Sequence, residues 1–156
     1  MTVETERLMG VSMSAGSCHL LFVDDSYDDH FFFQNAVRQL LPGVRLLQPL
    51  HDGVEALAYL CGDGHFADRH SYPFPDLMVL DLRMPIKNGH EVLAWLRSHP
   101  SPPVTVVFSA SDLQRDIVRA SALGARHYFV KPCDWTEWRK AVKAIAQYCP
   151  RRAVSE

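Results

Sequence analysis

Five charged or hydroxyl side chains of this sequence come after short apolar runs, and together they could carry out phosphoryl transfer. They are Asp24, Asp25, Asp81, Ser109 and Lys131. Phosphoryl transfer needs a nucleophile, groups that neutralise the phosphoryl oxygens and a hydrogen-bond donor; a carboxylate, a lysine and a serine can fill these roles. The sequence has neither a kinase-type glycine loop nor a G-x-x-x-x-G-K-[ST] motif. We therefore expect the phosphoryl group to arrive from a partner rather than from a bound nucleotide.

The three carboxylates in this set predict a metal site. Asp24, Asp25 and Asp81 carry like charges, which repel each other by several kcal/mol when they lie a few ångströms apart at an intermediate dielectric constant. A divalent cation would remove this repulsion. Mg²⁺ is the expected ion, because it takes a few protein oxygens and fills its other positions with water and phosphate oxygens.

Strand-like and helix-like segments alternate along the chain. Short apolar runs predict five strands, at residues 19–23, 44–49, 77–80, 104–108 and 127–130. Helical patterns follow them, at residues 27–41, 53–60, 89–98, 112–123 and 135–145. Strict alternation predicts an α/β fold with a parallel sheet and helices on both faces. Ligands bind outside the carboxyl ends of such strands, which is where the five side chains fall.

Polar residues and glycine mark the ends of these helices. Ser26 and Asp134 are predicted N-caps, and Asp28 and Asp29 fall in a first turn, where carboxylates favour the helix dipole. Gly124 is the predicted residue after a helix C-terminus.

The composition indicates one globular domain without a basic surplus. The 156 residues are 47% apolar and 22% charged, and the net charge of −2 argues against partners such as nucleic acid or anionic lipid. No apolar run reaches the roughly 20 residues that a membrane span requires. Residues 1–17 lack the pattern of a secretory signal, so we expect a cytoplasmic protein with a disordered tail at residues 1–17.

Four cysteines are widely spaced and form no C-x-x-C pair: Cys18, Cys61, Cys133 and Cys149. In a cytoplasmic protein this spacing favours apolar fillers or free thiols over a disulfide or a zinc site. The polar loop at residues 62–75 also carries no recognisable metal-ligand spacing.

Five motifs, in this order, resemble those of response-regulator receiver domains. They are Leu21-Phe22-Val23-Asp24-Asp25-Ser26, Leu80-Asp81-Leu82-Arg83-Met84-Pro85, Asn88-Gly89, Phe108-Ser109-Ala110 and Tyr128-Phe129-Val130-Lys131-Pro132. The resemblance implies a flavodoxin-like (βα)5 fold, a doubly wound five-stranded parallel sheet with strand order 2-1-3-4-5. It places the receiver domain at residues 18–149, with a tail at residues 150–156 that is too short for an output domain.

The resemblance also implies roles for the acidic residues. Asp81 would accept the phosphoryl group from the phosphohistidine of a histidine kinase. Asp25 would bind Mg²⁺ directly and Asp24 largely through water, and the main-chain carbonyl of Arg83 would be a further ligand. The protein would thus be a phosphoacceptor that supports its own phosphotransfer and slow autodephosphorylation, not an enzyme.

The remaining motif residues would sense the phosphoryl group. By resemblance, Ser109 and Lys131 would hold the phosphoryl oxygens, and Tyr128 would be an aromatic switch that turns inward when Ser109 moves. Pro132 would follow a cis peptide bond.

A narrower resemblance concerns partners. The loop at residues 62–75, with Tyr72-Pro73-Phe74-Pro75-Asp76, resembles the single-domain regulators paired with phytochromes. This implies a sensor histidine kinase of the bacteriophytochrome type, a homodimer and a downstream protein target.

The run at residues 31–33 should expose at least one phenylalanine ring for kinase docking, and we expect substitution of Phe32 and Phe33 to slow phosphotransfer without unfolding.

Two other functions remain open from the residues alone. An aspartate-nucleophile phosphohydrolase would also form a phosphoaspartate, but it needs an acid two residues after the nucleophile, where this chain has Arg83. A phosphorylation-independent adaptor would need only the fold, although the acceptor-site residues are present.

Overall fold

The computed structural model describes residues 17–150. The tails expected at residues 1–17 and 150–156 lie almost entirely outside the described residues. Residues 17–150 contain five strands and five α-helices, which alternate as the sequence predicts. No helix in this part of the chain is long and apolar enough to cross a membrane.

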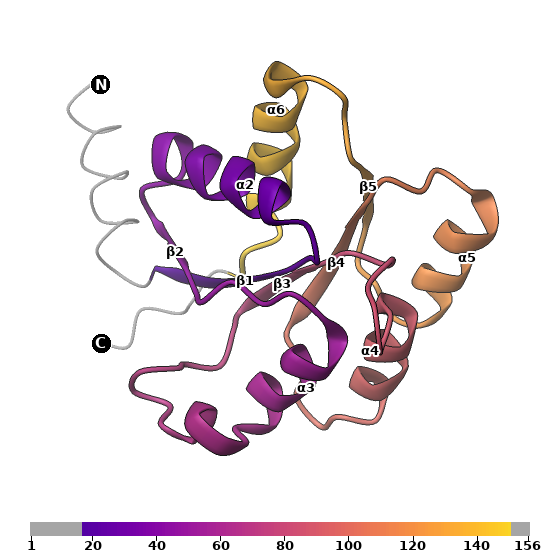
Figure 1. Cartoon of the computed structure of the whole chain (residues 1–156). Coiled ribbons are helices and arrows are strands. Elements are labelled where there is room, and N and C mark those ends of the chain that lie inside the picture. The colour runs from indigo at the N-terminus through magenta and orange to yellow at the C-terminus, as the bar shows by residue number, and fades with distance from the viewer. Residues whose placement is uncertain (1–16, 151–156) are drawn as a thin grey trace.

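All five strands pair in parallel in one sheet with the order β2-β1-β3-β4-β5, which confirms the predicted fold class (Figure 1). The strands are β1 (Cys18–Val23), β2 (Val44–Leu46), β3 (Leu77–Leu80), β4 (Val104–Ser109) and β5 (Tyr128–Val130). Strand β2 is shorter than predicted. Its ladder with β1 ends at Leu46, and beyond it single backbone bonds hold the chain, such as Leu47 N to Leu20 O at 2.8 Å.

The helices cover both faces of the sheet (Figure 1). They are α2 (Tyr27–Leu40), α3 (Gly53–Cys61), α4 (Gly89–Arg97), α5 (Gln114–Ala122) and α6 (Trp135–Ala146), with a 3₁₀ turn η1 (Gly64–Ala67) after α3. Helices α2 and α6 lie on one face, and α3, α4 and α5 lie on the other. Helix α5 begins two residues later than predicted, because the Ser111 hydroxyl accepts a hydrogen bond from Leu113 N at 3.3 Å and holds the preceding residues in a turn.

Each face of the sheet has its own apolar core, because side chains alternate along a strand. In β1, Leu20 and Phe22 pack with residues of α2 and α6, whereas Leu21 and Val23 pack with residues of α3 and α4. All four are at most 1% exposed. Burying a large apolar side chain contributes about 1.5–3 kcal/mol, so these two layers provide most of the stabilisation of the sheet.

The three residues predicted to mark helix ends, Ser26, Asp134 and Gly124, are confirmed in that role. The Ser26 hydroxyl accepts a hydrogen bond from Asp29 N at 3.2 Å, and the Asp134 carboxylate accepts one from Glu137 N at 2.8 Å. Gly124 has a φ of 101°, in the left-handed region that glycine tolerates best.

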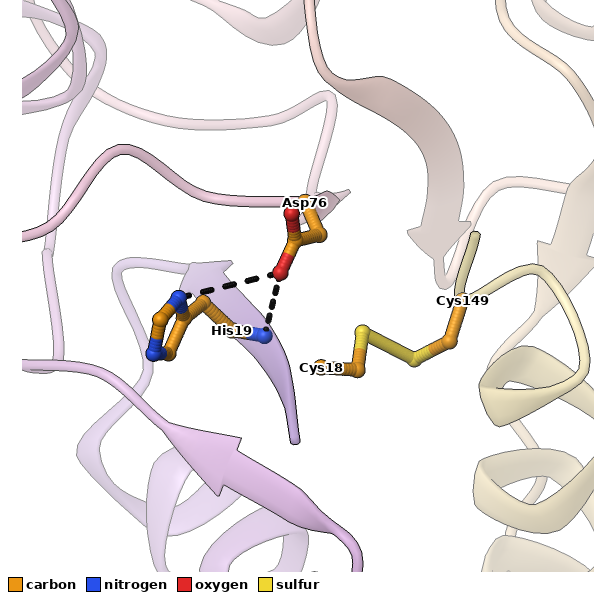
Figure 2. The surroundings of a disulfide bond; sticks show 4 residues. All are labelled: Cys18, His19, Asp76 and Cys149. Carbon is orange, nitrogen blue, oxygen red and sulfur yellow. Dashed lines mark hydrogen bonds and ion pairs between the residues drawn. A yellow bond between two sulfur atoms is a disulfide. The ribbon is translucent and has the colours of Figure 1, made fainter. Parts of the chain in front are cut away.

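A disulfide joins Cys18, at the start of β1, to Cys149, after α6, with Cα atoms 5.9 Å apart (Figure 2). The expectation of unpaired cysteines is therefore wrong for this pair, whereas Cys61 and Cys133 are exposed free thiols. A separation of 131 residues gives no spacing signal in the sequence. The two residues meet because α6, like the helices that connect the strands, runs antiparallel to the strands, so it ends near their amino ends (Figure 1).

Candidate functional site

The carboxyl ends of four strands bring the predicted side chains to one edge of the sheet. Asp24, Asp81 and Lys131 each follow the last residue of a strand, and Ser109 is the last residue of β4. Backbone hydrogen bonds continue the ladder there, from Asp81 N to Val23 O at 3.0 Å and from Lys131 N to Ser109 O at 2.8 Å. The sheet itself therefore fixes where these side chains start.

Asp24, Asp25 and Asp81 form an acidic cluster. Among residues 17–150 they are the one group of three or more potential metal ligands whose ligand atoms all lie within 4.8 Å of one another. Asp24 is 0% exposed and Asp81 is 4% exposed, while Asp25 faces solvent. Carboxylate oxygens with one side open to water suit a hard divalent cation.

The electrostatics of the cluster also fit a cation. Burial, with repulsion from Asp24, raises the pKa of Asp81 to about 6 despite the attraction of Lys131. Burial likewise raises the pKa of Asp24. An added cation favours ionised carboxylates, so both the donor atoms and the charge of this site fit a divalent metal ion.

The Lys131 ammonium lies among three carboxylates. Its Nζ is 2.7 Å from Asp24 Oδ2, 2.7 Å from Asp29 Oδ2 and 3.6 Å from Asp81 Oδ2. Burial lowers the pKa of Lys131, but the attraction of Asp81 and Asp24 outweighs burial and raises the pKa above its usual range. Lys131 is therefore a permanent positive charge within reach of Asp81.

Asp29 is a site residue that the sequence pattern missed. In the sequence it has only the role of a first-turn carboxylate that favours the helix dipole. In the structure its side chain accepts a hydrogen bond from Lys131 Nζ, 102 residues away. Its place three residues after the N-cap Ser26, on the helix that opens at the same strand end as Asp24, is the signal that could have identified it.

His30 holds the backbone that carries Asp24. Its Nε2 lies 2.8 Å from Asp24 O and 2.9 Å from Leu50 O, and because both partners are carbonyl oxygens, Nε2 must carry the proton. Burial lowers the pKa of His30, which favours the neutral ring. The Asp24 side chain is oriented further by Ser26 N, which donates to Asp24 Oδ1 at 2.9 Å. The sequence pattern gave His30 no role.

Ser109, Ser111 and Tyr128 form a connected group beside the acidic cluster. Ser111 N donates to Ser109 Oγ at 3.2 Å, and the Tyr128 hydroxyl donates to Ser111 O at 2.7 Å. Burial raises the pKa of Tyr128, so this hydroxyl remains a donor at neutral pH. A displacement of Ser109 can thus reach Tyr128 through Ser111.

Asp116, in the first turn of α5, ties this group to the loop after Asp81. Its Oδ2 accepts a hydrogen bond from Ser111 Oγ at 2.5 Å and lies 3.7 Å from Arg83 Nη2. The hydrogen bond from Ser111 lowers the pKa of Asp116. The sequence pattern did not identify Asp116, because nothing in its spacing relates it to Arg83.

Gly89 allows α4 to begin directly against the acceptor strand. A Cβ atom at this position would lie 2.4 Å from Asp81 O and 2.8 Å from Leu82 Cα. Gly89 N also donates to Leu82 O at 3.0 Å. Any side chain here would displace the backbone that carries Asp81.

The peptide bond before Pro132 is trans, since no cis peptide bond occurs in residues 17–150. The expected cis bond is therefore wrong. An X–Pro bond favours trans by about 0.5–1 kcal/mol unless tertiary contacts select the other isomer. Here the trans form already places Lys131 beside Asp24 and lets Pro132 O accept the indole N–H of Trp138 at 3.1 Å.

Known proteins share both this sequence pattern and this fold. Residues 21–143 match the response regulator receiver domain family. The response regulator Rcp1 of Synechocystis sp. is 30% identical over 132 residues, which cover 83% of this chain and 86% of Rcp1. A protein-glutamate methylesterase/protein-glutamine glutaminase of Desulfotalea psychrophila is 33% identical over 114 residues, but they cover 29% of that protein.

Solved structures agree with these relatives. The phosphorylated cyanobacterial phytochrome response regulator RcpA superimposes with a TM-score of 0.78 at 30% identity, covering 86% of this chain and 94% of RcpA. The Mn²⁺-bound form of Rcp1 gives a TM-score of 0.75 at 26% identity, covering 89% of this chain and 99% of Rcp1.

A five-stranded parallel sheet with acidic, hydroxyl and lysine side chains at its carboxyl edge defines a flavodoxin-like signalling domain built around a carboxylate. The chain belongs to the response-regulator receiver domain family of two-component signalling, and it is homologous to phytochrome-associated regulators. Proteins of this family are phosphoacceptors that interact with histidine kinases and bind a divalent metal ion.

Proposed function

We propose that this protein accepts a phosphoryl group from a sensor histidine kinase on Asp81 and signals through a phosphorylation-dependent change of its surface. The observation that carries the proposal is the position of Asp81, which is 4% exposed, within the acidic cluster and 3.6 Å from Lys131 Nζ. A buried carboxylate flanked by carboxylates and a lysine is costly for stability alone, and it matches the parts that phosphoryl transfer requires.

Asp81, Lys131 and Ser109 each have a separate role in the proposed transfer. A carboxylate oxygen of Asp81 attacks the phosphorus of the phosphohistidine, and the imidazole leaves. Lys131 exchanges its contacts with Asp24 and Asp29 for the phosphoryl oxygens, to which Ser109 donates a hydrogen bond. Mg²⁺, when bound, would neutralise charge on the phosphoryl oxygens.

The metal ligands follow from the cluster. Asp25 and Asp81 would bind Mg²⁺ directly, Asp24 would act through water, and the main-chain carbonyl of Arg83 would complete the protein ligands. Support comes from the proximity of the three carboxylates and from the Mn²⁺-bound form of the relative Rcp1.

The switch would pass through Ser111. When Ser109 moves toward the phosphoryl group, Ser111 N loses its acceptor, and the hydrogen bond from the Tyr128 hydroxyl to Ser111 O rearranges. Tyr128 then turns inward, which changes the surface of α5, β5 and α6. That surface would bind a downstream protein or a second copy of the chain. Slow autodephosphorylation, tuned by the residues flanking the site, would end the signal.

The likeness to RcpA and Rcp1 supports a kinase of the phytochrome type, and phosphotransfer from it would take place in the cytoplasm. A phosphohydrolase is disfavoured because the residue two positions after Asp81 is Arg83, whose guanidinium pairs with Asp116. Homodimerisation is part of the same proposal and is testable by light scattering with and without phosphorylation.

The direct test is intact mass spectrometry after incubation with Mg²⁺ and phosphoramidate. A single phosphoryl adduct should form only with Mg²⁺, and it should vanish in Asp81→Asn. The matched control is Asp28→Asn, which changes an exposed aspartate of the same end of the molecule and should leave the adduct intact. Absence of an adduct in the unchanged protein, together with no binding of beryllofluoride, would leave the adaptor function instead.

The exposed rings of α2 are the proposed docking contact for the kinase. Phe31 is 62% exposed and Phe32 40% exposed, whereas Phe33 is 0% exposed and belongs to the core. Phe33 is therefore no exposed docking contact, and replacing it together with Phe32 would remove core packing at a cost of about 3–5 kcal/mol. Phe31→Ala should slow transfer from the kinase and leave phosphorylation by phosphoramidate unchanged; an equal rate of transfer from the kinase would exclude Phe31 as a docking contact.

A further inference from the structure

At the amino ends of the strands, opposite the acidic cluster, backbone hydrogen bonds hold Cys18 in place. Cys18 N donates to Gly43 O at 3.2 Å, where β2 begins. The next residue, His19, exchanges two bonds with Asp76: His19 N donates to Asp76 Oδ2 at 2.8 Å, and Asp76 N donates to His19 O at 2.8 Å. Figure 2 shows this carboxylate beside His19 and next to the disulfide. Cys18 is 7% exposed, so its sulfur is a fixed, buried point of the sheet.

Within residues 17–150 the backbone N–H of Cys149 makes no hydrogen bond to the sheet, and its side chain packs only partly against the core that contains Cys18. Cys149 follows the end of α6, and its own backbone N–H bonds only to Ala146 O, at 3.1 Å, within the same turn. Its side chain is half-buried. The disulfide can therefore open without breaking any strand pairing, and an incoming thiolate can reach Cys149 more easily than Cys18.

The residue before Cys149 connects this turn to β5. The Tyr148 ring stacks on His127 with centroids 5.6 Å apart and meets Phe129 edge-on at 6.0 Å. His127 and Phe129 flank Tyr128, the proposed switch. These ring contacts join the end of α6 to the residues on both sides of Tyr128.

We infer that Cys18 and Cys149 form a reversible thiol–disulfide modification site that fixes the end of α6 to β1 when oxidised. Its co-reactants are low-molecular-weight disulfides and thiols of the glutathione class. The Cys149 thiolate attacks a disulfide RSSR, a mixed disulfide forms and RS⁻ leaves. The Cys18 thiolate then attacks the Cys149 sulfur, the protein disulfide forms and a second RS⁻ leaves, so that two thiols are oxidised and one RSSR is reduced to two thiols.

One feature separates this pair from a disulfide that a fold requires. Small domains need disulfides when their apolar core is too small, but here separate cores cover both faces of the sheet. The site also goes beyond the proposed phosphotransfer, since neither cysteine belongs to the acidic cluster. In the cytoplasm, where thiols are kept reduced, the pair would be open at rest and would close on oxidation.

The chemical test uses Cys61→Ser/Cys133→Ser, which removes the two exposed free thiols and leaves this pair. The native protein is equilibrated in glutathione buffers, then denatured in the presence of N-ethylmaleimide so that the buried Cys18 is also alkylated, and weighed intact. Reduced glutathione should give two adducts per chain, and oxidised glutathione should give none. Resistance of the disulfide to reduced glutathione without denaturant would overturn the inference, and so would uptake of two glutathiones in place of the intramolecular bond.

The structural test is hydrogen exchange of the oxidised and reduced forms of the same variant. Reduction should lower Tm by roughly 10 °C, as expected for opening so long a loop, and should speed exchange at residues 144–149 and 127–130 at least tenfold. Cys149→Ser should show the exchange rates of the reduced form under both oxidising and reducing conditions. This variant changes the half-buried cysteine, so the test does not depend on whether Cys18→Ser, at the buried position, folds. Unchanged exchange at residues 127–130 would refute the coupling to β5. Neither experiment involves phosphorylation, so failure here would not bear on the role of Asp81.

Discussion

The two ends of the sheet differ in the interactions that their residues make. At the carboxyl ends of the strands, Asp24 and Asp81 are buried together, and Lys131 does not prevent burial from raising the pKa of either carboxyl group. At the amino ends, a disulfide and paired backbone bonds hold β1 to its neighbours. One end thus carries an excess of negative charge that a metal ion and a phosphoryl group can use, and the other end is held by backbone hydrogen bonds and by a disulfide that adds stability only when it is oxidised.

The largest expected effect comes from opening the stabilised end. Under oxidising conditions, Cys149→Ser should lower the free energy of unfolding by about 4 kcal/mol, because the crosslink restricts the unfolded chain over a loop of more than a hundred residues. Phosphorylation of Asp81 by phosphoramidate should be unchanged. Urea unfolding gives the first value, and intact mass gives the second. A loss of phosphorylation in a folded variant would mean that the effect of the disulfide extends beyond the residues around Tyr128 to the acidic cluster itself.

At the charged end, a substitution is expected to raise the free energy of unfolding rather than lower it. Because the folded-state pKa of Asp81 is raised to about 6, its ionised form is disfavoured in the folded state. The cost is absent below about pH 4, where the carboxyl group is protonated in both states, and it is complete above pH 6. Without metal at pH 7, Asp81→Asn should therefore be more stable than the unchanged protein, by roughly 2 kcal/mol.

Urea unfolding from pH 4 to pH 7 in the presence of a chelator measures this difference. The free energy of unfolding of the unchanged protein should fall relative to Asp81→Asn as the pH rises. Addition of Mg²⁺ should restore it in the unchanged protein far more than in the variant. A difference that is constant with pH would show that Asp81 is already compensated by Lys131.

The sequence predicted the charged end better than the stabilised one, for a physical reason. Asp81, Ser109 and Lys131 follow apolar runs, and the parallel topology alone brings strand ends together. Asp29, Asp116 and the two paired cysteines were missed, because the pairs Asp29–Lys131, Asp116–Arg83 and Cys18–Cys149 join residues far apart in sequence, which meet only once the helices have packed on the sheet. The cis bond before Pro132 was wrong because it came from resemblance rather than from any contact of this chain.

The smallest expected effect concerns the contact that restrains the switch. Asp116→Asn keeps an acceptor for the Ser111 hydroxyl but removes the charge that holds Arg83. A hydrogen bond to a charged group contributes about 1 kcal/mol more stability than a hydrogen bond to a neutral group. If this pairing favours the resting arrangement of Ser109 and Ser111, the affinity for beryllofluoride should rise about fivefold, because the same free energy no longer opposes the rearrangement.

Titration of beryllofluoride in the presence of Mg²⁺, followed by tryptophan fluorescence, measures this affinity. The matched control is Asp112→Asn, which changes an exposed aspartate just before α5 and should leave the affinity unchanged. A lower affinity in Asp116→Asn would mean that Asp116 supports the phosphorylated arrangement instead. The charged end would then contain its own stabilising element, and the contrast between the two ends of the sheet would apply only to the acidic cluster.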